Sequence, residues 1–350
     1  MTKIEEKEFL RKKPLLFFAL FLSACFAFCQ SDDYIGEDYA AGPLYGKNLY
    51  IPYLVHYNFP SLPAKAGAKW DFSYHLSTYL VQDARYIENY SFPHGGTRSY
   101  DKRNVLRDYE SIVGEWGIAF NPLRELQVGM DMRLIAYYNG FWDAAVEGFH
   151  KAFHFPNGSR ELFLQNQIYV NIENDNGITF FLDKEAVTLG DIDLWSKWTF
   201  YETPKISLAL LGAVKIPTGK LDSLSGSGYP DIAAGVLADI RSLWWLSVYV
   251  QSGAVFPLET KSYPMFNGLV GVEFHPLQLF SFNVQMNIKS PPVTGYGLSL
   301  PQTNLLVGFS FMHKGLKWQF FLEEDPFTNQ GTDITFNLMF SHTLHLNKGK

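Results

Sequence analysis

The sequence has little with which to form disulfides or to bind a metal through sulfur, because its 350 residues include only two cysteines. Both of them, Cys25 and Cys29, lie within the first thirty residues. If that segment is removed during export, the mature protein contains no thiol. A disulfide framework and a cysteine metal site are then both excluded.

Charged residues are also scarce, at 18% of the chain where about 25% is typical of soluble domains. The formal net charge is −6, and no run rich in lysine and arginine occurs beyond the N-terminus. The chain therefore lacks the basic patch that phosphate binding requires, and we expect no nucleic acid partner. In contrast, 17% of the residues are aromatic. Aromatic residues favour strands, and Tyr and Trp gather at membrane interfaces.

Residues 1–29 have the form of a secretory signal peptide. Basic residues at positions 7 and 11–13 precede an apolar run at 14–22, which is the order found in such signals. Small residues before Gln30 predict cleavage there. Two alternatives stay open: a lipoprotein, in which Cys25 of a Leu-Ser-Ala-Cys motif carries the lipid, and an uncleaved anchor. No later run approaches the roughly 18 apolar residues of a membrane helix.

The clearest structural pattern occupies residues 280–289, where large apolar and polar residues alternate. Alternate side chains of a strand point to opposite faces, so this stretch predicts a strand with one apolar and one polar face. A tilted strand of about ten residues crosses the hydrocarbon of a bilayer. The apolar residues are Phe280, Phe282, Val284, Met286 and Ile288, and the polar ones are Ser281, Asn283, Gln285, Asn287 and Lys289.

From Lys69 onward this pattern repeats in about fourteen strands, or about twelve if the uncertain pair around residues 174–177 is omitted. Short connections alternate with long loops, which is how bacterial outer-membrane barrels are connected. We therefore predict an all-β, antiparallel up-and-down transmembrane β-barrel over residues 69–346. Helical spacing of apolar residues within 140–162 predicts one short amphipathic helix in a long loop.

Residues 30–68 form an acidic, glycine-rich lead-in to the predicted barrel. Within it, the apolar stretch 50–57 contains Pro52, and proline removes a hydrogen-bond donor from a central strand. We expect an extended segment that is either an edge piece or tucked into the lumen.

The apolar faces of the predicted strands carry tryptophans near the strand ends, as expected for a lipid-facing band with aromatic girdles. These residues are Trp70, Trp116, Trp198, Trp244 and Trp318. The alternative is a soluble sandwich, or a large barrel whose polar face points outward.

The opposite faces carry charged and amide side chains that we expect to line the lumen. For the group formed by Asp191, Asp193 and Lys197, two roles are open. They could order ions or bias the charge of a solute, or they could pair with neighbouring strands, and we favour pairing. The full set of lumen candidates is Asp131, Arg133, Asp191, Asp193, Lys197, Lys215, Gln285, Asn287 and Lys289.

Motifs for catalysis or metal binding are weak. His150 and His154 are four residues apart in the predicted helix, a spacing that zinc could use. Lys151 follows His150, however, so the HExxH pattern of metalloproteases is absent. Ser73 and His75 share one strand face, but a catalytic triad needs spatial contacts that the sequence does not give. We assign no catalytic residue, no metal and no cofactor.

Several short motifs resemble those of an uncharacterised family of bacterial outer-membrane β-barrel proteins, and the latter half is similar to porin-like transporter barrels associated with phenol degradation. This resemblance implies the barrel and its location, and it implies no reaction. The motifs are Gly42-Pro43-Leu44, Gly148-Phe149-His150 with the insertion up to Arg160, Gly190-Asp191-Ile192, Lys215-Ile216-Pro217-Thr218-Gly219, Gly226-Ser227-Gly228 and Asp231.

The sequence thus predicts a porin-like outer-membrane channel or transporter that passes small solutes through a polar lumen. One alternative is a membrane-embedded enzyme acting on lipid, with Ser73 or His75 as catalytic residues. Another is a surface binding or scaffold protein that uses the loops at 83–103 and 140–162. The expected partners are outer-membrane lipid, small solutes of unknown identity, and the barrel-assembly machinery during biogenesis.

Overall fold

A computed structural model describes residues 40–87, 105–153, 166–173, 177–277, 279–293, 301–325, 332 and 334–346. The expected signal peptide at 1–29 lies outside these residues, and so does His154. The helices of the described part are all too short or too polar to cross a bilayer.

The described residues form fourteen strands joined in one antiparallel sheet. Alternating large apolar and polar residues, with β-branched and aromatic side chains among them, favour the extended conformation along each of these segments. The strands are β1 (Asp71–Ile87), β2 (Val105–Phe120), β3 (Leu126–Tyr138), β4 (Tyr169–Glu173), β5 (Thr179–Leu182), β6 (Ala186–Glu202), β7 (Ile206–Ile216), β8 (Asp231–Leu243), β9 (Leu246–Pro257), β10 (Met265–Leu277), β11 (Phe280–Lys289), β12 (Gln302–His313), β13 (Leu316–Glu324) and β14 (Ile334–His345).

Twelve of the fourteen strands close into a ring, because β1 pairs with β2 on one side and with β14 on the other. The β1–β14 ladder runs in unbroken register from Asp71 opposite His345 to Gln82 opposite Ile334. The remaining two strands, β4 and β5, form a hairpin that extends the end of β2 through residues 106–108. The predicted antiparallel barrel, with fourteen strands or twelve, is therefore confirmed. The strand pair around residues 174–177, whose omission gives twelve, is the pair outside the ring.

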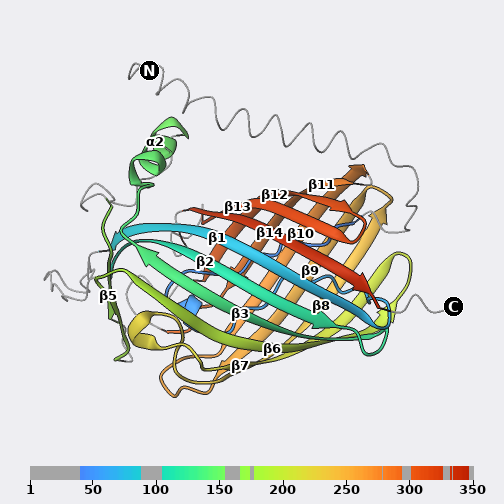
Figure 1. The fold of residues 1–350 in the computed structure, drawn as a ribbon, viewed down its shortest axis with the longest axis horizontal. Coiled ribbons are helices and arrows are strands. Elements are labelled where there is room, and N and C mark those ends of the chain that lie inside the picture. The colour runs from blue at the N-terminus through green and yellow to red at the C-terminus, as the bar shows by residue number, and fades with distance from the viewer. Residues whose placement is uncertain are drawn as a thin grey trace, which may run out of the picture. The chain divides into compact units, whose positions relative to one another are not determined.

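The connections alternate in length around the ring, as predicted. Strands β2 and β3 are joined by residues 121–125, and β12 and β13 by residues 314–315, whereas β7 and β8 are joined by residues 217–230. The helix α2 (Asp143–Phe153) lies within the long connection after β3. In Figure 1, α2 and β5 lie at one end of the barrel, and β14 finishes at the other.

Apolar side chains cover the outer face of the ring and polar side chains its inner face, which is the reverse of a soluble protein. On β11 the five large apolar residues are each at least 37% exposed, whereas Ser281, Asn283 and Gln285 are at most 2% exposed. The five tryptophans expected on the apolar faces are all exposed. A closed ring with this polarity rules out two stacked sheets enclosing a dry interior.

A lysine on the apolar exterior should destabilise the protein according to its depth along a strand. In lipid vesicles, we expect Val284→Lys, in the middle of β11, to lower the free energy of unfolding by about 2–4 kcal/mol. The matched change Leu277→Lys, at the last residue of β10, should cost about 0–1 kcal/mol. Urea titrations followed by tryptophan fluorescence measure both, and equal losses would contradict lipid contact at the middle of β11.

Candidate functional site

Residues 40–66, named here the plug segment, run inside the ring of strands. The plug segment contains one short 3-10 helix, η1 (Tyr53–Val55), and forms no strand in its described residues. Tyr50, Tyr53 and Tyr57 are each at most 2% exposed. Its hydrogen-bond partners come from β3, β6 and β7 on one side and from β8 to β13 on the other, and it forms an ion pair with β2. Only an internal position allows contacts with all of these strands.

Irregular backbone leaves its N–H groups without ladder partners, and buried N–H groups need acceptors. Inward carboxylates of the strands supply these acceptors. The N–H of Ala41 donates to Glu273 Oε1 at 2.7 Å, and the N–H of Tyr57 donates to Asp231 Oδ2 at 2.7 Å. Further along, Asp239 accepts from the consecutive N–H groups of residues 64 and 65 at 2.9 and 3.0 Å.

The carbonyl groups of the plug segment are matched in the same way by inward cations. Lys215 Nζ donates to the carbonyl of Val55 at 2.7 Å, and Arg133 Nη1 donates to the carbonyl of residue 54 at 3.3 Å. Lys197 Nζ donates to the carbonyls of residues 63 and 65, at 2.7 and 2.9 Å. Side chains of the ring therefore replace the strand neighbour that this backbone lacks.

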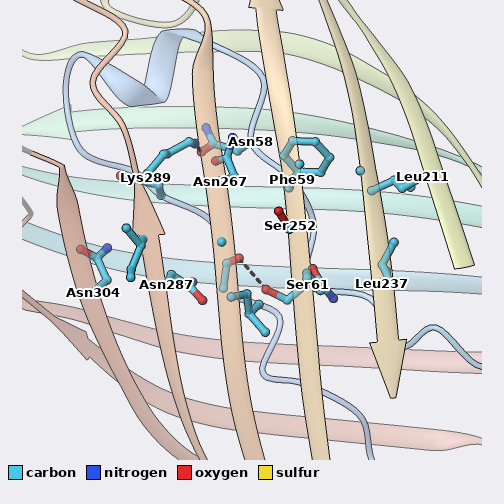
Figure 2. A pocket seen from close by; sticks show the side chains of 18 of the residues that line it. Asn58, Phe59, Ser61, Leu211, Leu237, Ser252, Asn267, Asn287, Lys289 and Asn304 are labelled. Atoms are coloured by element: carbon cyan, nitrogen blue, oxygen red, sulfur yellow. Dashed lines mark hydrogen bonds between the residues drawn. The ribbon is translucent and has the colours of Figure 1, made fainter. Parts of the chain in front are cut away.

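Beside the plug segment, a pocket separates it from the inner faces of strands β7 to β12 (Figure 2). Residues of the plug segment, including Asn58, Phe59 and Ser61, form one side of it. Amide side chains such as Asn267 and Asn304 stand on the opposite wall. Lys289 is the only ionisable residue in this lining, so the pocket itself contains no carboxylate.

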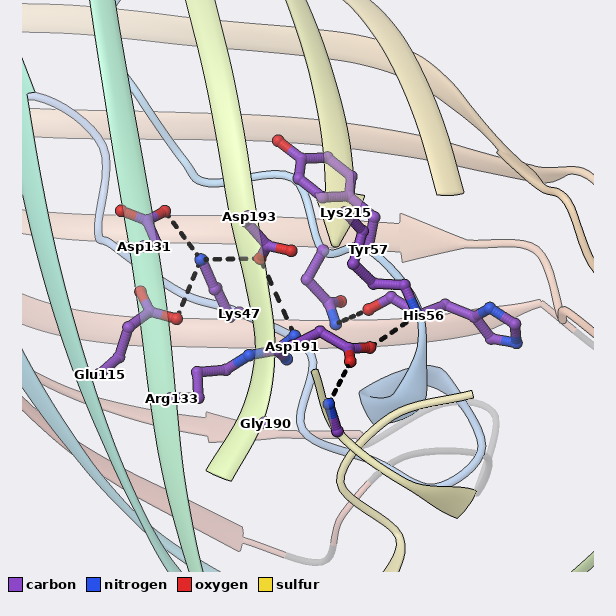
Figure 3. A network of polar contacts seen from close by, with 12 residues as sticks. Lys47, His56, Tyr57, Glu115, Asp131, Arg133, Gly190, Asp191, Asp193 and Lys215 are labelled. Atoms are coloured by element: carbon purple, nitrogen blue, oxygen red, sulfur yellow. Dashed lines mark hydrogen bonds and ion pairs between the residues drawn. The ribbon is translucent and has the colours of Figure 1, made fainter. Parts of the chain in front are cut away.

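Across the lumen, β2, β3 and β6 carry a dense charged cluster centred on Lys47 of the plug segment (Figure 3). Lys47 Nζ lies 2.9 Å from Glu115 Oε2, 3.1 Å from Asp131 Oδ2 and 3.7 Å from Asp193 Oδ2. Arg133 Nη2 lies 3.8 Å from the same Asp193 oxygen. Burial alone would lower the pKa of Lys47, but the carboxylates of Asp131, Glu115 and Asp193 raise that pKa above its ordinary value.

A second charged cluster lies on β6, β7 and β8 around Lys215. Its Nζ is 2.7 Å from Asp191 Oδ2 and 3.4 Å from Asp231 Oδ2. His56 of the plug segment faces the same Asp231, with Nδ1 at 3.4 Å from Oδ2. Asp191 also accepts from the N–H of Gly219 at 2.8 Å, which ties the loop after β7 to the wall. This cluster therefore holds both the plug segment and a long loop.

The structure places eight of the nine lumen candidates in buried positions, and Asn287 in a partly buried one. Asp131, Arg133 and Asp193 meet around Lys47, and Asp191 meets Lys215. The other four contact the plug segment or each other: Lys197 bonds its carbonyls, Gln285 accepts from the N–H of residue 44, Asn287 accepts from Gln285, and Lys289 donates to Asn58.

Sequence reasoning missed several residues that complete these clusters. Glu115 and Glu273 alternate with apolar neighbours, so the two-residue period could have identified both as inward-facing. Lys47 and His56 lie in irregular backbone, where no periodicity indicates direction. Only the folded chain shows that they reach the carboxylates of the wall.

One group of side chains has the composition of a metal site. His75, Glu115 and Asp131 offer ligand atoms that all lie within 4.8 Å of one another. The ammonium of Lys47, however, already contacts both carboxylates and supplies positive charge there. Of the two weak candidates from the sequence, His150 lies in α2 and His154 is outside the described residues, and our prediction stays that this pair holds no metal.

A serine–histidine pair also occurs, on the neighbouring strands β9 and β10. Ser247 Oγ is 3.0 Å from His275 Nε2. A hydrolase needs an acid that orients the histidine and access for the substrate. His275 Nδ1 has no hydrogen-bond partner among the described residues, and Ser247 is fully buried. The pair therefore lacks both requirements.

Comparison with solved structures finds outer-membrane channels of similar fold. The COG4313 outer membrane channel from Pseudomonas putida F1 matches with a TM-score of 0.53 at 11% identity, covering 80% of this chain and 98% of that one. The KdgM porin matches with a TM-score of 0.40 at 7% identity, covering 79% and 99%. The Pseudomonas putida toluene transporter TodX matches with a TM-score of 0.36 at 7% identity, covering 81% and 92%. The first of these likenesses supports the barrel fold.

Comparison with curated proteins gives no match. A family model described as "Protein of unknown function (DUF3187)" matches residues 95–344, which include eleven of the twelve ring strands in full or nearly so. This match covers well over half of the sequence and excludes the plug segment. The chain therefore belongs to the DUF3187 family of proteins of unknown function.

Proposed function

We propose that this protein is a channel of the bacterial outer membrane that passes small solutes, with the plug segment narrowing its lumen. The observation that carries the proposal is the polarity of the closed ring, apolar outside and polar inside. Such a ring satisfies its backbone hydrogen bonds within the sheet, as a bilayer requires. Its polar interior offers water-soluble molecules a route that lipid does not.

The plug segment decides how wide that route is. It is held at both ends, by Glu273 near residue 41 and by Asp239 at residues 64 and 65, with the Lys47 and Lys215 clusters between them. The pocket beside it is one part of the lumen that it leaves open. We propose that solutes pass on this side and that the charged clusters keep the plug segment in place.

The two alternative functions, an enzyme acting on lipid and a surface scaffold, gain no comparable support from the arrangement of the side chains. His75 Nε2 has no hydrogen-bond partner among the described residues, and the Ser247–His275 pair lacks the acid and the access that a hydrolase needs, so we propose no catalytic residue. In the loops at 83–103 and 140–162, which a surface scaffold would use, residues 88–103 and 154–162 fall outside the described residues.

Deleting residues 40–66 should widen the pore. In planar lipid bilayers, we expect the full-length protein to give small, discrete conductance steps and the deletion variant to give steps several times larger. Heat-modifiable migration on gels serves as the control that the barrel of each sample is closed. Absence of conductance from both closed proteins would contradict the channel, and equal steps would contradict the role of the plug segment.

Removing the ammonium of Lys47 should loosen the plug segment, because three carboxylates then lose their central cation. Breaking a buried ion pair by removing one partner costs about 3–5 kcal/mol. We expect Lys47→Met to raise the fraction of time spent in large-conductance states and to lower the unfolding midpoint. Lys205→Met, which removes an exposed lysine, is the matched control. Identical channel records for the two variants would show that Lys47 does not anchor the plug segment.

A further inference from the structure

The pocket between the plug segment and the wall differs chemically from the rest of the lumen. Its lining contains no carboxylate, although carboxylates dominate the clusters across the lumen. Nine of its twenty lining residues carry neutral amide or hydroxyl side chains. Its empty space is about 590 Å³ when the part open to solvent is included.

Three amide groups of this lining have no hydrogen-bond partner among the described residues: Asn267 Nδ2, Gln302 Nε2 and Asn304 Oδ1. Gln302 is 1% exposed and Asn304 is 4% exposed, so bulk water does not reach them freely. Leaving a buried polar group unsatisfied costs about 1–3 kcal/mol. All three residues line the pocket, so two unpartnered amide NH2 groups and one unpartnered amide oxygen belong to its wall.

The single charged group in the lining, the ammonium of Lys289, already contacts the plug segment. Lys289 Nζ donates to Asn58 Oδ1 of the plug segment, and it lies 5.7 Å from the centre of the Tyr53 ring. Figure 2 shows Lys289, Asn58 and Asn267 gathered at one end of the pocket. No acid lines the pocket, so the site offers a cation no counter-charge, and its one ammonium is already hydrogen-bonded to the plug segment.

An apolar surface lies beside these amides. The ring of Phe59 packs on the glycines of β8 and β9, since a Cβ added to Gly253 would lie 2.6 Å from Phe59 Cζ. Leu211 and Leu237 also contribute to the lining. A solute that fits must therefore offer C–H groups on one side and several donors and acceptors on another. Each amide supplies two donors and one acceptor oxygen, and each hydroxyl can donate and accept.

We propose that this pocket binds a neutral, polyhydroxylated solute, a monosaccharide or polyol, as the class of molecule that the channel passes. The proposal rests on the channel function argued above. Asn267, Gln302 and Asn304 recognise the hydroxyl groups, and the Phe59 ring contacts the carbon skeleton.

The test measures binding and conductance on the same full-length protein. Saturation-transfer difference NMR in detergent micelles reports binding of D-glucose and of its anionic counterpart D-gluconate. The variants are Asn267→Leu, which loses no hydrogen bond to the described residues, and Gln302→Met. The matched control is Asn337→Leu on β14, because Asn337 is an amide as buried as Gln302, has no hydrogen bonds in the described chain and does not line the pocket.

We expect a D-glucose signal that falls at least threefold in Asn267→Leu and Gln302→Met, is kept in Asn337→Leu, and exceeds the D-gluconate signal. Equal glucose signals in all three variants, or no glucose signal, would overturn the proposal. A stronger gluconate signal would also overturn it and would make Lys289 an anion site. A protein that conducts but does not bind glucose would support the channel function and contradict the proposed sugar site. A protein that binds glucose but does not conduct would contradict the channel function and support a sugar-binding pocket.

Discussion

Pairing of the first and last strands is the interaction on which the rest of the structure depends. The β1–β14 ladder removes both free edges of the sheet at once. Irregular backbone and open sheet edges are tolerated at membrane depth only where protein covers them. Closure also divides space into an exterior of apolar side chains and an interior of polar ones. Both the plug segment and the charged clusters exist because that interior is shielded.

The plug segment shows how an irregular chain is accommodated in such an interior. Its backbone has no neighbouring strand, so its N–H groups bond carboxylates such as Glu273 and Asp239, and its carbonyls bond Lys197 and Lys215. The inward side chains thus supply the hydrogen bonds that a neighbouring strand would supply, at defined positions along residues 40–66. The attraction between opposite charges within each cluster offsets part of the cost of removing these groups from water, which is several kcal/mol per ion.

Charge is distributed unevenly around the lumen, and this unevenness gives the interior two functions. On the side of β2, β3, β6 and β7, ion pairs centred on Lys47 and Lys215 fix the plug segment. On the side of β8 to β12, amides line a pocket that has no carboxylate, and three of its polar groups lack partners among the described residues. The charged groups on one side bind the plug segment, and we propose that the amides on the other side bind a solute.

The sequence by itself determined the barrel, the strand count and the inward direction of residues such as Asp131 and Gln285, because a two-residue period assigns each side chain of a strand to one face. It also located the helix in the loop after β3. Periodicity says nothing about irregular backbone, so it gave no direction for Lys47, His56 or Asn58, and no separation of charged from neutral walls. Only the tertiary structure decided these points. Closing the ring brings strands that are distant in sequence around the plug segment, and their positions determine which inward side chains form pairs and which have no partner among the described residues.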